Sequence, residues 1–183
     1  ADSSKAVTIA NSYEEHLSIS GSKSWSDDNN RDNKRPASIT VNLFADGTKV
    51  TSQKITTADG WKYEFTDLPK YKDGKEIKYT ITEDAVAGYT SSIDGFNITN
   101  TYTPEKVQVS GSKNWNDDGN AAGTRPGSIT IRLYANGSEI GHKTVTEKDG
   151  WSWNWTGLNR YDTDHKEISY TISEDAVDGY TST

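Results

Sequence analysis

The chain has 183 residues, of which 31% are hydrophobic, and its net charge at pH 7 is −7. Its lysines and arginines are scattered rather than clustered, so we expect it to bind neither nucleic acid nor an anionic membrane. No apolar run approaches the ~20 residues that span a bilayer, which predicts no membrane insertion, and with no cysteine there can be no disulfide bond.

The first half of the chain is a series of short segments in which apolar and polar residues alternate, as they do in strands with one buried face. In chain order these are "LSISGSKSW" (17–25), "ASITVNLFADGTKV" (37–50), "DGWKYEF" (59–65), "KEIKYTITE" (75–83) and "GFNITNTYTP" (95–104). The "ADG" within the second segment indicates a hairpin. No stretch of ten residues has the 3.6-residue period of a helix. The pattern therefore predicts an all-β fold of the sandwich class with essentially no helix.

The same series then repeats about 90 positions later. "GSKSWSDDNNRDNKRP" begins at Gly21 and "GSKNWNDDGNAAGTRP" begins at Gly111. A period of this length suits a small domain, so we predict two tandem β-sandwiches. We place the first domain at 14–104 and the second at 105–183, joined by a short segment that Pro104 stiffens.

Three of the predicted strands carry one polar residue on an otherwise apolar face. Lys23, Glu83 and Asn100 each stand where the alternation places a side chain inside the sandwich. An unpaired amine, carboxyl group or carboxamide is costly in a thin apolar core. We therefore expect the three groups to meet.

Their meeting would have chemical consequences. Burial disfavours charge, so the Lys23 amine would be neutral and nucleophilic, and Glu83 would be protonated. Glu83 would polarise the carbonyl of Asn100 and shuttle a proton as the Lys23 nitrogen attacks and ammonia leaves. The product is an amide bond between the first and last strands across 77 positions (100 minus 23). By the loop-entropy estimate used for disulfides, such a link stabilises the fold by roughly 4–5 kcal/mol.

Several motifs together resemble the Cna B-type domain of Gram-positive surface proteins, over nearly the whole chain. They are "K-x-W-x-D-D", the "RP" before an alternating strand, "Y-T-I-T-E", "GY" and "I-T-N-T-Y-T-P". The resemblance implies a reverse-immunoglobulin β-sandwich with a spontaneous Lys-Asn isopeptide bond, assisted by an acidic residue. At matching positions these residues are Lys23, Asn100 and Glu83.

The resemblance also implies a biological role. Such domains are stalk or spacer repeats of adhesins and pili, located outside the cell on the bacterial wall, with neighbouring repeats of the same protein as partners. A domain bonded between its terminal strands resists pulling and proteolysis. Isopeptide formation is a single turnover within the fold, so we expect no enzyme activity in the usual sense and no cofactor.

The second copy departs from the pattern. It supplies Lys113 and Glu174 at matching positions, but it stops before a closing strand with an asparagine. Meanwhile "VTIANSY" near the start of the chain resembles "FNITNTY" before Pro104. We therefore predict that residues 1–13 are the closing strand of a preceding repeat and that Asn11 is the partner of Lys113.

Within one molecule this strand would have to fold back past a complete domain, because the chain from Asn11 to Lys23 spans at most ~40 Å. We therefore expect residues 5–13 to pass head-to-tail to the second domain of a neighbouring molecule.

The sequence also allows other functions. The six tryptophans and the tyrosines favour, as an alternative, a module that binds glycan or host extracellular-matrix protein through an aromatic sheet face. A hydrolase would need a convergent catalytic set, which the sequence lacks. Asp28, Asn30 and Asp32 alternate as the first ligands of a calcium loop do, but the glycine and the distant glutamate of such a loop are missing. We interpret them as a solvated turn and expect no metal.

Overall fold

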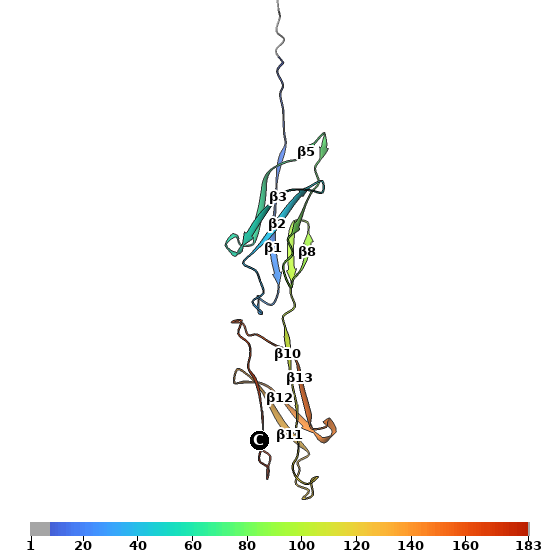
Figure 1. Ribbon diagram of the computed structural model, residues 1–183, viewed down its shortest axis with the longest axis vertical. Helices are drawn as coiled ribbons and strands as arrows, with labels where there is room; N and C mark the ends of the chain where they lie inside the picture. Colours follow the sequence, from blue (N-terminus) through green and yellow to red (C-terminus); the bar gives the residue numbers. More distant parts are fainter. Residues whose placement is uncertain (1–7, 183) are drawn as a thin grey trace, which may run out of the picture. The chain divides into compact units, whose positions relative to one another are not determined.

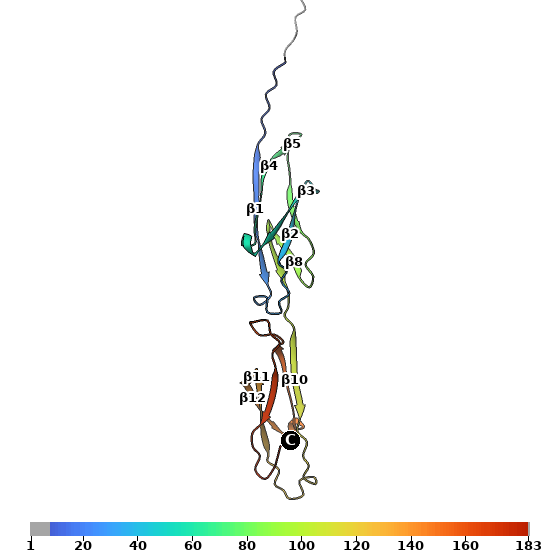
Figure 2. The same ribbon diagram turned by 60° about the vertical axis from the view of Figure 1, so that its left-hand side comes forward.

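The structure is a computed structural model that describes residues 8–182. Contacts divide the chain into two units. Unit 1 is Ala1–Asp27 with Arg35–Tyr102, and unit 2 is Asp28–Lys34 with Thr103–Thr183. Both consist almost entirely of strands and loops (Figures 1 and 2), with a single 3-10 turn described in each. The prediction of an all-β fold with essentially no helix is confirmed.

Unit 1 has two main sheets and a short hairpin. The four-stranded sheet has the order β4 (Lys62–Pro69), β1 (His16–Ser26), β9 (Asn97–Thr101), β8 (Thr90–Asp94). The three-stranded sheet has the order β3 (Thr48–Thr56), β2 (Ser38–Ala45), β7 (Tyr79–Glu83), and the hairpin pairs β5 (Tyr71–Lys72) with β6 (Lys75–Glu76). The turn η1 (Thr57–Asp59) precedes β4. β1 is antiparallel to β4 but parallel to β9, so the first and last strands of unit 1 lie side by side.

The core of unit 1 lies between these two sheets. Its buried apolar residues come from both, and they include Ile19, Ile39, Val41, Leu43, Ile55, Tyr63, Phe65, Leu68, Ile81 and Ile98. Along β2, β4 and β9 the buried positions alternate with less buried ones, as the sequence pattern predicts. Each sheet covers the apolar face of the other, which makes unit 1 a β-sandwich.

Gly21 explains why β1 and β9 approach so closely. A Cβ atom at this position would lie 1.8 Å from the carbonyl oxygen of Phe96, which immediately precedes β9. The same carbonyl accepts a hydrogen bond from the hydroxyl of Tyr63 at 2.5 Å. The glycine two residues before Lys23 therefore leaves space for the closing strand.

Unit 2 repeats part of this architecture. One sheet pairs β10 (Lys106–Ser112) with β13 (Ser152–Asn159), and the other has the order β12 (Ser138–Thr146), β11 (Ser128–Ala135), β14 (Tyr170–Glu174). The turn η2 (Glu147–Asp149) precedes β13. Within residues 8–182, unit 2 has no strand that corresponds to β8 or β9. One edge of β10 is therefore without a partner strand in the described chain.

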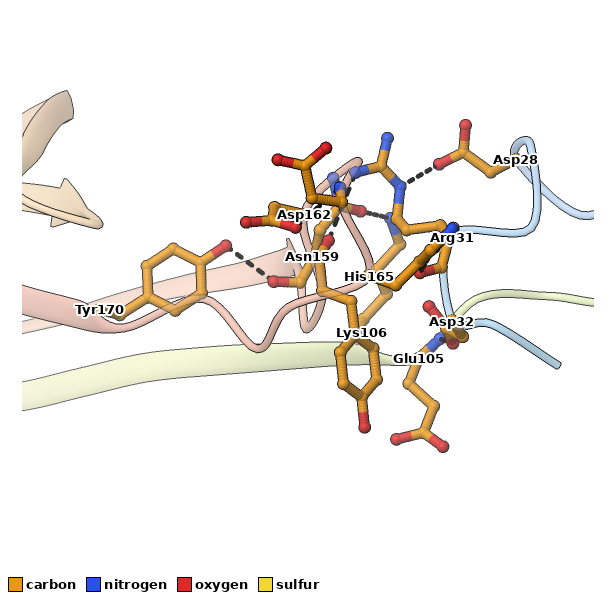
Figure 3. A network of polar contacts seen from close by, with 11 residues as sticks. Asp28, Arg31, Asp32, Glu105, Lys106, Asn159, Asp162, His165 and Tyr170 are labelled. Carbon is orange, nitrogen blue, oxygen red and sulfur yellow. Dashed lines mark hydrogen bonds and ion pairs between the residues drawn. The ribbon is translucent and has the colours of Figure 1, made fainter.

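Unit 2 also includes the loop 28–34, which follows β1 in the sequence. The carboxylate of Asp32 accepts the backbone N–H of Glu105 at 2.6 Å, and His165 Nδ1 donates to the carbonyl of Arg31 at 3.1 Å (Figure 3). The segment is a turn, but Asp32 is buried rather than solvated, and this N–H compensates its carboxylate for the loss of water. The expectation of a solvated turn is wrong for this residue.

Candidate functional site

Lys23 projects from β1 into the interior of unit 1. Its backbone N–H donates to the carbonyl of Trp61 at 2.7 Å, and its side chain is 0% exposed. The Nζ atom lies 4.6 Å from the centroid of the Trp25 ring. Burial lowers the pKa of the Lys23 amine from its ordinary value of 10.5, and the neighbouring Glu83 opposes only part of this shift. Removal from water therefore moves this amine towards its neutral, nucleophilic form.

Glu83 reaches the lysine from the facing sheet. It is the last residue of β7, pairs with Val41 of β2, and has a side chain that is 1% exposed. Its Oε1 lies 2.9 Å from the Nζ of Lys23, but the approach is not directed as a hydrogen bond. Within the described chain, Nζ and both carboxylate oxygens lack a hydrogen-bond partner. Close contact without directed bonding leaves these atoms able to bond to a third group.

Asn100 belongs to the strand beside the lysine. In the parallel ladder Ile98 pairs with Lys23 and Asn100 pairs with Trp25, so the carboxamide is one inward position further along β9. Asn100 is 0% exposed, and neither its Oδ1 nor its Nδ2 has a hydrogen-bond partner within residues 8–182. The structure thus places all three predicted residues inside one sandwich with their polar atoms unsatisfied.

A polar cluster that the sequence analysis missed lies beside the lysine. The guanidinium of Arg35 donates to both carboxylate oxygens of Asp27, at 3.0 and 2.6 Å, and the hydroxyl of Tyr89 donates to Asp27 at 2.9 Å. Arg35 covers Trp25 at 5.2 Å, and Trp25 packs edge-to-face on Trp61 and Tyr89. The repeated "DD", "RP" and "GY" motifs were the signal for this cluster. It fixes the tryptophan against which the Lys23 amine lies.

Unit 2 contains the same cluster. Arg125 donates to both oxygens of Asp117 at 2.9 and 2.6 Å, Tyr180 donates to Asp117 at 3.1 Å, and Arg125 lies over Trp115. The Arg125 guanidinium lowers the pKa of Asp117 to about 2. The surroundings of the second lysine are therefore built in the same way, and these tryptophans serve packing within each unit.

The lysine of unit 2 has a looser environment. Lys113 Nζ donates to Glu174 Oε2 at 2.8 Å, and the hydroxyl of Ser182 donates to the same oxygen at 2.5 Å. The side chains of Lys113 and Glu174 are 16% and 10% exposed, against 0% and 1% for the pair in unit 1. Lys113 and Glu174 therefore form a partly exposed ion pair. In unit 1 the corresponding pair of Lys23 and Glu83 is buried together with the carboxamide of Asn100.

Asn11 lies in the exposed segment that precedes β1 and forms no strand. Of the predicted donor segment 5–13, residues 5–7 lie outside the described residues. Within the described part of the chain, no group of three or more potential ligands can hold a metal ion. No helix among residues 8–182 is long and apolar enough to cross a membrane.

Comparison with known proteins identifies the family of this chain. The sequence profile of the Cna protein B-type domain matches residues 19–101 and 109–183. The collagen adhesin of Staphylococcus aureus is 45% identical over 178 residues, which are 96% of this chain and 15% of the adhesin.

Two solved structures of the S. aureus collagen-binding surface protein Cna are similar to this chain. A single B repeat unit has 43% identity and a TM-score of 0.48, over 91% of this chain and 90% of that one. Two B repeat units have 44% identity and a TM-score of 0.49, over 92% and 45%. Since the profile matches two successive segments that together cover most of the sequence, this chain belongs to the Cna protein B-type domain family and contains two such domains in tandem.

Proposed function

We propose that this chain is a stalk or spacer segment of a bacterial surface adhesin or pilus, and that unit 1 is locked by an isopeptide bond between Lys23 and Asn100. The observation that carries the proposal is the buried group of Lys23, Glu83 and Asn100, whose polar atoms lack hydrogen-bond partners in the described chain. The Lys23 amine contacts only the Glu83 carboxylate, and the buried carboxamide of Asn100 has no hydrogen-bond partner in the described chain, an arrangement that is costly unless the amine and the carboxamide combine.

The chemistry needs only these three side chains. The neutral Lys23 nitrogen attacks Cγ of Asn100, and the C–N bond to the amide nitrogen breaks. Glu83 hydrogen-bonds the carbonyl oxygen and relays a proton from the attacking nitrogen to the amide nitrogen that leaves, so that Glu83 ends the reaction as it began it. One ammonia leaves for each bond formed. The reaction occurs once within a folded domain, so the domain is not an enzyme.

The position of the bond suits a load-bearing segment. β1 and β9 are parallel neighbours at opposite ends of the unit 1 sequence. A bond from Lys23 to Asn100 lets tension pass from one strand directly to the other. The 76 residues between them (24–99) then carry no load.

The organisation of the longer protein is part of the same proposal. We assign the domains to 14–104 and 105–183, with residues 1–13 as the closing strand of a preceding repeat. Neighbouring repeats would be the immediate partners, and the location would be the outer surface of a bacterial cell. The similarity to an adhesin and to a surface protein supports this assignment.

Single-molecule pulling between the chain ends tests the mechanical role. In the natural chain, residues 23–100 should never extend. In Lys23→Ala the unfolding of unit 1 should release 77 further residues (100 minus 23), a gain of roughly 270 Å at full extension. Lys62→Ala, an exposed lysine on β4, is the matched control and should behave as the natural chain does. Full extension of unit 1 in the natural chain would contradict the proposal.

A further inference from the structure

We propose that a cluster of four residues in unit 1 positions the Lys23 amine for bond formation and so sets the rate of the reaction. The cluster consists of Trp25, Asp27, Arg35 and Tyr89, and we call it the tryptophan clamp. Trp25 lies against the amine, and the other three residues hold Trp25 there. None of the four exchanges atoms in the reaction. This inference rests on the proposed function, because it concerns the rate at which the same bond forms.

Trp25 contacts both the lysine and the arginine of the clamp. The Nζ of Lys23 lies 4.6 Å from the centroid of the Trp25 ring, and the Cζ of Arg35 lies 5.2 Å from it. Trp61 and Tyr89 pack edge-to-face on the same ring, with centroids 5.2 and 5.1 Å away. Moving the ring away from the lysine would break all of these contacts.

Asp27 connects the other members of the clamp. Its side chain is 1% exposed, and its carboxylate accepts two hydrogen bonds from the guanidinium of Arg35 and one from the hydroxyl of Tyr89. A guanidinium that donates two bonds to one carboxylate is fixed in both distance and orientation. Burial and the neighbouring Asp27 carboxylate raise the pKa of Tyr89, so its hydroxyl stays protonated and remains a donor. Arg35 and Tyr89 are thereby held where they contact Trp25.

The clamp also joins the strands that carry the three reacting groups. Asp27 directly follows β1, which carries the lysine. Arg35 lies shortly before β2, the strand that pairs with β7 and its Glu83. Tyr89 directly precedes β8, the strand that pairs with β9 and its Asn100. Hydrogen bonds among these loops therefore tie the three sets of strands together, and reacting groups that are held at close range combine faster.

A second effect of the clamp is to keep water from the amine. The Lys23 side chain is 0% exposed, and this burial lowers the pKa of its amine, while Glu83 opposes only part of the shift. Because Trp25 lies against the Nζ atom, a loosened clamp would admit water to the amine. Water favours the charged form of the amine, which is not a nucleophile. A loosened clamp should therefore slow the reaction.

Unit 2 contains the same arrangement at its own lysine. Asp117 accepts two hydrogen bonds from Arg125, at 2.9 and 2.6 Å, and one from Tyr180, at 3.1 Å. Trp115 packs edge-to-face on Tyr180 with centroids 5.0 Å apart. The Nζ of Lys113 lies 5.0 Å from the centroid of Trp115, against 4.6 Å for the matching pair in unit 1. The same four residue types therefore surround the lysine in both units.

The clamp of unit 2 forms without local strand structure. Residues 113–116, which contain the lysine and the tryptophan, follow β10 and belong to no strand. The matching residues 23–26 are part of β1 and pair with residues 98–101 of β9. Since the clamp is present in both settings, its contacts do not depend on pairing with a closing strand. In unit 1 the clamp can thus hold the lysine in place before the carboxamide of Asn100 reaches it.

The test uses two substitutions that preserve the charge of the clamp. Arg35→Lys keeps the cation but loses the paired hydrogen bonds to Asp27, and Tyr89→Phe keeps the ring but loses its hydroxyl. The full chain is isotope-labelled in a short pulse of synthesis, and mass spectrometry follows the loss of one ammonia from the labelled chains. Each variant should form the bond roughly 10- to 100-fold more slowly, because a misplacement of about 1 Å can cost a factor of this size.

Tyr79→Phe is the matched control. It removes from unit 1 a hydroxyl that donates to the carbonyl of Pro69 at 2.7 Å, outside the clamp. The control should form the bond at the natural rate. Natural rates in both clamp variants, or an equal slowing in the control, would overturn the clamp.

A second readout separates positioning from general support of the fold. In an Asn100→Ala chain, in which the bond cannot form, the nitrogen NMR shift of the Lys23 Nζ reports the protonation of the amine. We expect its pKa to lie below 10.5 and to move towards 10.5 when Arg35→Lys or Tyr89→Phe is added, but not when Tyr79→Phe is added. An amine that titrates alike in all of these chains would overturn the clamp.

The outcomes separate this inference from the proposed function. Clamp variants that lose ammonia as fast as the natural chain would overturn the clamp and leave the bond between Lys23 and Asn100 intact. A natural chain that loses no ammonia would overturn the proposed function, and the role of the clamp in forming the bond with it.

Discussion

A single buried lysine determines most of what unit 1 can do. The burial of Lys23 together with Glu83 and Asn100 could be predicted from the sequence. Alternation along each strand places all three side chains inside the sandwich, whichever strands pair. The contacts among Asp27, Arg35 and Tyr89 could not be predicted, because these residues lie in loops outside the strands, where the repeated motifs mark the residues but alternation says nothing about their contacts.

The proposed role of Glu83 is to carry the proton during bond formation, and a substitution of its carboxyl group tests this role. Glu83→Gln preserves the shape of the side chain but cannot exchange a proton at neutral pH. We expect bond formation to slow by roughly 10²–10⁴-fold, the usual contribution of a positioned acid or base. The measurement is the fraction of chains that have lost one ammonia, followed by mass spectrometry after refolding.

Glu76→Gln is the matched control, since Glu76 is exposed on β6. It should form the bond at the natural rate. A Glu83→Gln chain that forms the bond as fast as the control would remove Glu83 from the mechanism.

At the scale of the strands, local pattern and long-range pairing contribute differently. The strands and the "ADG" and "ANG" hairpins follow from alternation and turn residues, and β2–β3 and β11–β12 form where they were expected. The parallel pairing of β1 with β9 has no local signal, because it joins residues about 75 positions apart. The loss of strand structure at 113–116 could not be predicted for the same reason.

The closing strand should also stabilise unit 1 through its apolar side chain. Ile98 is fully buried on β9, whereas Ile93 on the neighbouring β8 is 42% exposed. Ile98→Ala should lower the free energy of unfolding of unit 1 by about 2–5 kcal/mol. Ile93→Ala should change it by about 0.5 kcal/mol or less. Hydrogen exchange of peptides from β1 and β9 reports on unit 1 alone, and equal effects of the two substitutions would contradict this role.

At the scale of the molecule, two related sequences give units whose described strands differ. The acidic composition, the period of about 90 residues and the shared motifs indicated the family and the tandem sandwiches. Unit 1 contains its closing strand, and its lysine is sealed from water. Unit 2 has no such strand in the described residues, and its lysine keeps an ion pair that is partly exposed.

In unit 1 we expect the side chains of Lys23 and Asn100 to combine without help from another protein. Intact-mass spectrometry of the denatured monomer, followed by peptide mapping, tests this most directly. We expect a mass one ammonia below that of the sequence and a branched peptide that joins the segments containing Lys23 and Asn100. Lys23→Ala and Asn100→Ala should each show the full mass of their sequence. A natural chain with its full sequence mass and no branched peptide would contradict the account.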